Sequence, residues 1–97
     1  MGNAITIKKE MALTHAGFWR GIAKALGTDA FQRTDDSVVL EGAGKRFEII
    51  IGPERERCIA RMVVEFVDVT LTFTGYTETE RAAALGAFDR AFQRGGG

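Results

Sequence analysis

The feature that most constrains the fold is the stretch Cys58–Tyr76, CIARMVVEFVDVTLTFTGY. It is the longest run of β-branched and aromatic residues in the chain, and it holds no proline and no glycine before Gly75. Such residues favour extended backbone on a pleated, half-buried surface. We therefore predict one long central strand, or two collinear halves of one, around which the other elements pack.

The two halves of this stretch carry different patterns. From Val69 onward, apolar residues alternate with threonines, which is typical of a strand with one buried face. Before that point, Met62, Val64 and Phe66 place apolar side chains on the face that later carries the threonines. A bulge near Val67 and Asp68 would shift the alternation by one residue and bring these three side chains into the same core.

Without a bulge, the face formed by Met62, Val64 and Phe66 needs another cover. Exposed apolar patches mark contact sites, and a second copy of the chain is the simplest cover. Both alternatives stay open at the level of sequence. The second makes Met62, Val64 and Phe66 a candidate protein interface and the chain a possible homodimer.

Two amphipathic helices are predicted, one before and one after the last three strands in the chain. Thr14 is a good N-cap for a helix that ends near Gly27. Thr77 and Glu80 match a capping box that opens a second helix. Gly17 and Gly21 have a spacing that would permit close approach of another element, although tolerated glycines are the favoured interpretation. The apolar stripes comprise Phe18, Ile22, Ala25 and Leu26 in the first helix, and Ala84, Leu85, Phe88, Ala91 and Phe92 in the second.

The remaining segments predict strands and turns. A short strand runs from Ile5 to about Met11, and the segments 38–40 and 45–51 form a hairpin around Gly42-Ala43-Gly44. The segment 54–57 alternates in charge and is interpreted as a solvated turn.

The order strand, helix, three strands, helix predicts an α+β two-layer sandwich. Its sheet would be mainly antiparallel, with about four strands and both helices on one face. The length indicates a single domain over residues 1–97, with loose ends at about 1–4 and 95–97.

The composition of the chain limits the cellular compartments and the classes of partner that we expect for it. The chain has 13 basic and 13 acidic residues, and this balance argues against nucleic acid or an anionic membrane as the main partner. Its single cysteine, Cys58, allows no internal disulfide. No signal peptide and no apolar run of about 20 residues is present. We therefore expect a cytoplasmic protein that does not enter a membrane.

Reactive side chains are few. The chain has one histidine, His15, and one cysteine, whereas zinc sites need several such ligands. We therefore expect no metal and no cofactor. Catalysis would require a pocket that joins His15 to a carboxylate such as Glu41 or Glu65, and an enzyme ranks third among the interpretations.

The favoured interpretation is a small non-catalytic interaction domain that uses its sheet to self-associate or to dock a protein partner. The alternative is a binding module for an anionic ligand or nucleic acid, since arginines suit phosphate groups and the chain holds nine arginines against four lysines. The candidate anion contacts are Lys45, Arg46, Arg81, Arg90 and Arg94.

Overall fold

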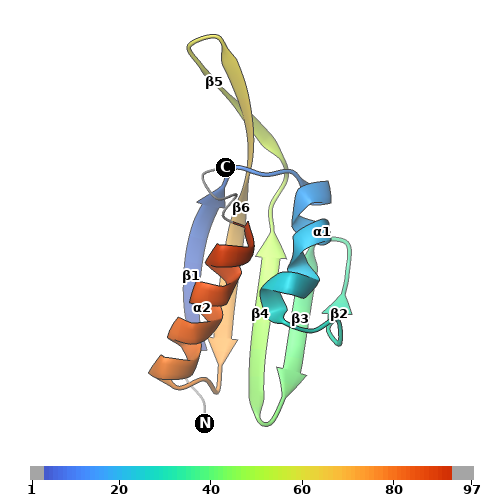
Figure 1. Cartoon of the computed structure of the whole chain (residues 1–97), viewed down its shortest axis with the longest axis vertical. Coiled ribbons are helices and arrows are strands. Elements are labelled where there is room, and N and C mark those ends of the chain that lie inside the picture. Colours follow the sequence, from blue (N-terminus) through green and yellow to red (C-terminus); the bar gives the residue numbers. More distant parts are fainter. Residues whose placement is uncertain (1–3, 93–97) are drawn as a thin grey trace.

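The computed structural model describes residues 4–92, which form a six-stranded antiparallel sheet and two helices (Figure 1). This confirms the predicted α+β class, with six strands rather than about four. The elements in chain order are β1 (Ala4–Met11), α1 (His15–Leu26), β2 (Gln32–Arg33), β3 (Ser37–Gly42), β4 (Lys45–Ile51), β5 (Arg55–Ile59), β6 (Met62–Thr74) and α2 (Glu78–Phe92).

Strand β6 is the centre of the sheet, as predicted. The strand order is β1-β6-β4-β3-β2, and every neighbouring pair is antiparallel. The second half of β6 lies between β1 and β4, so that Thr72 faces Thr6 on one side and Glu48 on the other. The first half of β6 pairs only with β5 and projects from the sheet (Figure 1).

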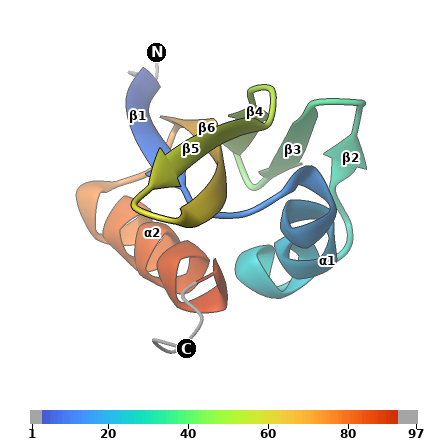
Figure 2. The same cartoon turned by 90° about the horizontal axis from the view of Figure 1, so that it is seen from above.

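The core lies between one face of the sheet and the two helices, which run side by side below it in Figure 2. Val69, Leu71 and Phe73 of β6 are buried on this face, while the intervening threonines are half-buried on the other. The predicted alternation of this half is therefore confirmed. The other large buried side chains of this core are Phe18, Ile22, Val38, Phe47, Ile49, Ile51, Val67 and Phe88.

Both helices begin where the sequence predicts. The Gly17 N–H donates to Thr14 Oγ1 at 3.0 Å, and α1 ends at Gly27 with a left-handed φ of 75°. At α2, the Thr77 N–H donates to Glu80 Oε1 at 2.9 Å and the Glu80 N–H donates to Thr77 Oγ1 at 3.1 Å. The capping box is thus confirmed. The hydrogen bond from the Thr77 backbone, together with that from Lys45, lowers the pKa of the Glu80 carboxyl.

Gly21 lets the two helices approach closely. A Cβ at this position would lie 2.7 Å from Cε1 of Phe92 on α2, and the Phe92 ring stacks on Phe18 with centroids 5.6 Å apart. The interpretation of Gly21 as a glycine that the helix merely tolerates is therefore wrong. At Gly17 the nearest atom to a Cβ is Thr14 Oγ1 at 3.4 Å, and none of the three nearest atoms within the described chain comes from another helix or strand.

The irregularity predicted near Val67 and Asp68 lies on the opposite segment instead. Ile51 faces Val69 and Arg55 faces Phe66, so residues 52–54 lie opposite only two residues of β6. Along β1, the register of β6 continues unbroken to Val67. The prediction of a bulge in β6 is therefore wrong, and the alternative of an uninterrupted strand is confirmed. The extra residue falls beside Pro53, which has no N–H to donate to a ladder.

The interpretation of residues 54–57 as a turn is also wrong, because Arg55–Ile59 forms β5. The turn lies at Ala60 and Arg61, so the central strand begins at Met62 rather than Cys58. Ala60 adopts a φ of 56°, where turns usually place glycine or asparagine.

The prediction of loose ends is wrong at Ala4, which belongs to β1 and pairs with Thr74. The other residues of these predicted ends, 1–3 and 95–97, lie outside the described residues. Neither helix within residues 4–92 has the length and apolar character needed to span a membrane.

Candidate functional site

The arm, defined as residues 55–66, is a two-stranded hairpin that projects from the body of the molecule (Figure 1). The molecule measures 49 × 26 × 22 Å, and the arm lies along the long dimension. Within residues 4–92, the strands of the arm pair only with each other. Both outer edges of the arm therefore present backbone N–H and C=O groups that no strand covers.

The tip of the arm carries the three most exposed large apolar side chains among the described residues. Ile59, Met62 and Val63 are 53%, 65% and 59% exposed. Among the described residues, the other large apolar side chains with high exposure are Ile5 and Ile50, and both lie in the body and are less exposed. Apolar surface concentrated in one place, rather than scattered singly, is typical of a contact site.

The base of the arm is covered by the chain itself. Phe66 is only 7% exposed, although it does not belong to the core between the sheet and the helices. The guanidinium groups of Arg55 and Arg57 lie 4.5 Å and 4.6 Å from the centre of its ring. Cations at this distance are attracted to the face of an aromatic ring, so two arginines of β5 supply the cover that Phe66 needs.

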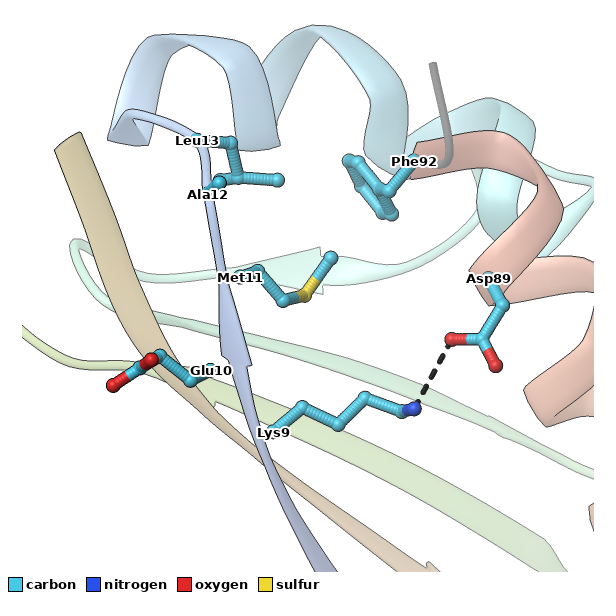
Figure 3. Close-up of a pocket in the computed structure, with 7 residues that line it drawn as sticks. All are labelled: Lys9, Glu10, Met11, Ala12, Leu13, Asp89 and Phe92. Carbon is cyan, nitrogen blue, oxygen red and sulfur yellow. Dashed lines mark ion pairs between the residues drawn. The ribbon is translucent and has the colours of Figure 1, made fainter. Parts of the chain in front are cut away.

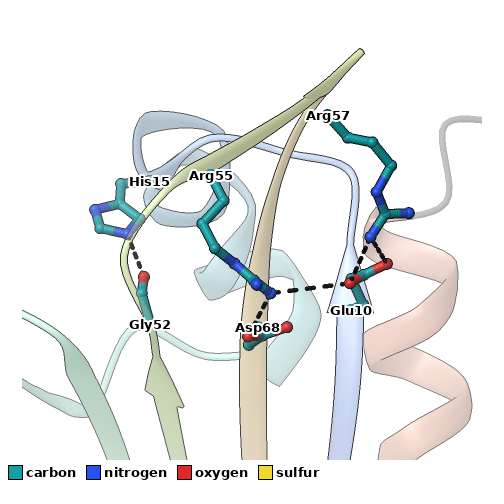
Figure 4. Close-up of polar contacts among 6 residues, drawn as sticks. All are labelled: Glu10, His15, Gly52, Arg55, Arg57 and Asp68. Atoms are coloured by element: carbon teal, nitrogen blue, oxygen red, sulfur yellow. Dashed lines mark hydrogen bonds and ion pairs between the residues drawn. The ribbon is translucent and has the colours of Figure 1, made fainter. Parts of the chain in front are cut away.

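Two carboxylates hold these arginines in place, as Figure 4 shows. Arg55 Nη2 lies 2.6 Å from Asp68 Oδ2 and 3.9 Å from Glu10 Oε2, and Arg57 Nη2 lies 3.2 Å from the same Glu10 oxygen. Each pair is half exposed and contributes little singly. Together they connect β1, β5 and β6 and order the base of the arm, while the tip extends beyond them.

His15 fastens the β4–β5 connection to the start of α1. Its Nε2 hydrogen-bonds the Gly52 carbonyl oxygen at 2.6 Å (Figure 4). Its backbone N–H donates to Glu54 Oε2 at 2.7 Å. A carboxylate at a helix N-terminus is favourable because N–H groups and the helix dipole point toward it. His15 thus has a structural role.

The structure does not join His15 to either carboxylate suggested for catalysis. Glu41 pairs with Arg46 across the β3–β4 hairpin. Glu65 lies on the arm, directly opposite Glu56. Within residues 4–92, no three His, Cys, Asp or Glu side chains cluster as metal ligands would.

The predicted interface residues share one face of β6 but differ in exposure. Met62 is exposed, Val64 is half-buried and Phe66 is covered. Sequence reasoning missed Ile59 and Val63, which are as open to contact as Met62. The segments 55–59 and 62–66 have equal lengths on either side of Ala60 and Arg61, and this could have indicated a hairpin. The two turn residues, however, include no glycine or asparagine, which are the usual sequence signal of such a turn.

The four candidate anion contacts that the structure describes do not form one cluster. Lys45 Nζ lies 3.0 Å from Glu80 Oε2, and Arg46 lies 3.7 Å from both Glu41 and Glu48. On α2, Arg81 and Arg90 are nine positions apart, which separates them by about 13 Å along the helix axis. The remaining candidate, Arg94, lies outside the described residues.

A shallow open depression of about 600 Å³ lies where β1 and α2 end (Figure 3). Met11, Leu13 and Phe92 give it apolar walls, and Lys9 Nζ reaches Asp89 Oδ1 at 3.2 Å. The seven lining residues include no Cys, His or Ser. The depression therefore offers an apolar patch and one ion pair, but no thiol, hydroxyl or imidazole group.

No protein-family model matches this chain, and no match was found among curated proteins or solved structures. The placement of its side chains is therefore the basis for any functional inference.

Proposed function

We propose that this chain is a small interaction domain without catalytic activity, and that it docks a protein through the arm. The observation that carries the proposal is the exposure of Ile59, Met62 and Val63 on a projecting hairpin whose outer edges pair with no strand of the described chain. The core of the body is closed without these three side chains. Their apolar character is therefore not explained by the fold.

A docked partner would supply what the arm lacks. An isolated two-stranded hairpin is only marginally stable in water, and here the body supports only its base. Covering apolar surface is worth about 25 cal/mol per Å², and a strand laid along an open edge adds backbone hydrogen bonds. Docking at the tip would therefore stabilise both the complex and the arm.

The alternative of an anionic ligand or nucleic acid stays a prediction with less support. Lys45 and Arg46 already face carboxylates, and Arg81 and Arg90 are far apart along α2. Binding to a nucleic-acid backbone would weaken steeply as salt is added. A salt titration with a labelled oligonucleotide tests this alternative directly.

Site-specific photo-crosslinking tests the docking proposal. A photoreactive amino acid replaces Met62 at the tip or, as a matched control, Ile50 on the open face of the sheet. Both native side chains are apolar and exposed, but only Met62 lies on the arm. In cells that express the chain, we expect Met62 to form adducts with one defined polypeptide, identified by peptide mass, and Ile50 to form none above background.

Absence of adducts at Met62, or equal adducts at both positions, would contradict docking through the arm. The identified polypeptide can be a second copy of this chain or another protein, and either supports the proposal. Chemical denaturation of both labelled proteins checks that the substitutions leave the fold intact.

A further inference from the structure

The two open edges of the arm differ in character. The β5 edge carries Arg55, Glu56 and Arg57, and charged side chains are a usual protection of an edge strand against pairing. The β6 edge instead carries Met62, Val63 and Val64 in succession. Apolar and β-branched residues of this kind favour strand pairing. The β6 edge is therefore the one suited to receive another strand.

The backbone of this edge is correctly oriented to pair. The Gly52 N–H donates to the Asp68 carbonyl at 2.8 Å, so the backbone groups of Asp68 face the side of β4 and β5. Backbone groups alternate along an antiparallel strand, so Val63 and Glu65 face the other side. Further along that side, β1 pairs with β6 and ends with Met11 opposite Val67. The edge that β1 leaves free begins there.

The sequence of this edge is complementary to itself. Arg61 and Glu65 lie two positions before and two positions after Val63. In two antiparallel copies related by a twofold axis at Val63, Arg61 of each copy, in the turn that precedes β6, comes to the position across from Glu65 of the other. Met62 of each copy then faces Val64 of the other, and the two Val63 side chains face each other. Opposite charges and apolar pairs in these positions favour pairing.

Neighbouring registers lose this match. A twofold axis at Val64 sets Val63 against Glu65, which would bring a carboxylate onto an apolar side chain. An axis at Met62 sets Arg61, at the turn, against Val63 and leaves Glu65 with no residue of the other β6 strand opposite it. Of the three registers centred on the apolar run, only the one at Val63 pairs charge with charge.

The single chain leaves Glu65 in need of a cation. Its neighbour directly across the hairpin is Glu56, and like charges in that position destabilise a strand pair. Among the ion pairs within residues 4–92, none involves Arg61 or Glu65. A second copy would bring Arg61 to each Glu65 on the side away from Glu56.

We propose, resting on the docking role of the arm, that its partner is a second copy of this chain, paired antiparallel along β6 with the twofold axis at Val63. The two arms then form one four-stranded sheet, in which the β6 strands are central and the charged β5 strands are the outer edges. On one face, Met62 and Val64 of both copies make a single apolar cluster. On the other, the two Val63 side chains lie between two pairs of Arg61 and Glu65.

Charge reversal tests the register. We expect a concentration-dependent dimer by analytical ultracentrifugation, and its Kd should rise about tenfold in Arg61→Glu or in Glu65→Arg, since each reversal sets like charges opposite each other twice. The double variant Arg61→Glu/Glu65→Arg restores the opposite-charge pairs and should return the Kd to within about threefold of the original. Ile50→Lys, in the body, is the control that should leave the Kd unchanged.

Disulfide trapping tests the position of the axis. In a Cys58→Ser background, Val63→Cys places two thiols on facing residues about 5.5 Å apart between Cα atoms, within the range that a disulfide spans. Mild oxidation should yield a covalent dimer. Met62→Cys in the same background faces Val64 of the other copy instead, and should cross-link much more slowly.

The outcomes separate this proposal from the docking role itself. A dimer with charge rescue and cross-linking at Val63 supports both. A strict monomer overturns self-pairing, while crosslinks from Met62 to another protein would still support docking. A dimer lost in Val63→Lys, but without charge rescue or trapping, overturns the register and retains the arm as the interface. A dimer unaffected by Val63→Lys overturns pairing through β6 altogether.

Discussion

Val63 and Val69 are the same residue type in the same strand, yet they have opposite environments. Both are at odd positions of β6, but Val69 is fully buried and Val63 is 59% exposed. Val69 lies in the half of the strand that has β1 and β4 as neighbours and the helices below. Val63 lies in the arm, where β5 is the single described strand beside β6. The difference shows that burial here is decided by what lies around the strand rather than by the residue.

The comparison assigns the two halves of β6 to different tasks. The half in the body closes a core and so determines the stability of the fold. The half in the arm extends its apolar side chains beyond that core, where they are available for contact. Substitutions in the two halves should therefore affect different measurements.

The largest effect on stability is expected in the body. Leu71→Ala removes a fully buried side chain and should lower the free energy of unfolding by about 2–5 kcal/mol. Met62→Ala, in the arm of the same strand, should change it by no more than about 0.5 kcal/mol. Denaturant unfolding at low protein concentration measures both. A cost for Met62→Ala close to that for Leu71→Ala would contradict the division between body and arm.

A smaller effect is expected where the helices meet. Gly21→Ala places a methyl group against the Phe92 ring, and overpacking of this kind costs about 1–3 kcal/mol. Gly17→Ala meets no second element, and should stabilise α1 by up to about 1 kcal/mol through helix propensity. The same unfolding experiment compares the two. Equal effects would show that the approach of α2 does not constrain Gly21.

The turn of the arm should respond locally. Ala60 adopts a φ of 56°, which disfavours an L-residue by about 1 kcal/mol, so Ala60→Gly should slow hydrogen exchange of the arm amides by about three- to fivefold. The amides of the body should exchange as before. Ala43 adopts a φ of 53° in the β3–β4 turn, and Ala43→Gly is the matched change within the body. Slowing of exchange throughout the molecule by Ala60→Gly would mean that arm and body unfold as one unit.

The smallest effect is a pH dependence confined to the body. Hydrogen bonds from Thr77 and Lys45 lower the pKa of Glu80 below its usual 4.5. The charged carboxylate is therefore the stabilising form: its contribution is complete above that value and is lost as pH falls through the lowered pKa. The stability difference between the original chain and Glu80→Gln should shrink over the same range. A difference that is constant with pH would contradict this account of the capping box.

The sequence predicts the body better than the arm for a physical reason. Thr14, Gly27, Thr77 and Glu80 act through neighbours in the chain, and the threonine alternation after Val69 reports directly on one covered face. These local signals correctly locate both helices and the second half of β6.

The errors concern contacts that the residues next to each position do not indicate. The close approach at Gly21 depends on Phe92 of the other helix. The cover of Phe66 depends on a register that is set by the turn at Ala60, where no glycine indicates a turn. For the site, sequence reasoning named Met62 but neither Ile59 nor Val63, because their exposure follows only once β5 is known to be a strand.

Hydrogen exchange at two protein concentrations tests the central claim most directly. If the arm docks a second copy through β6, the amides of Val63 and Glu65 should become more protected as concentration rises, while the Leu71 amide in the body should not change. Protection at Val63 and Glu65 that does not vary with concentration, or that rises equally at Leu71, would contradict the claim.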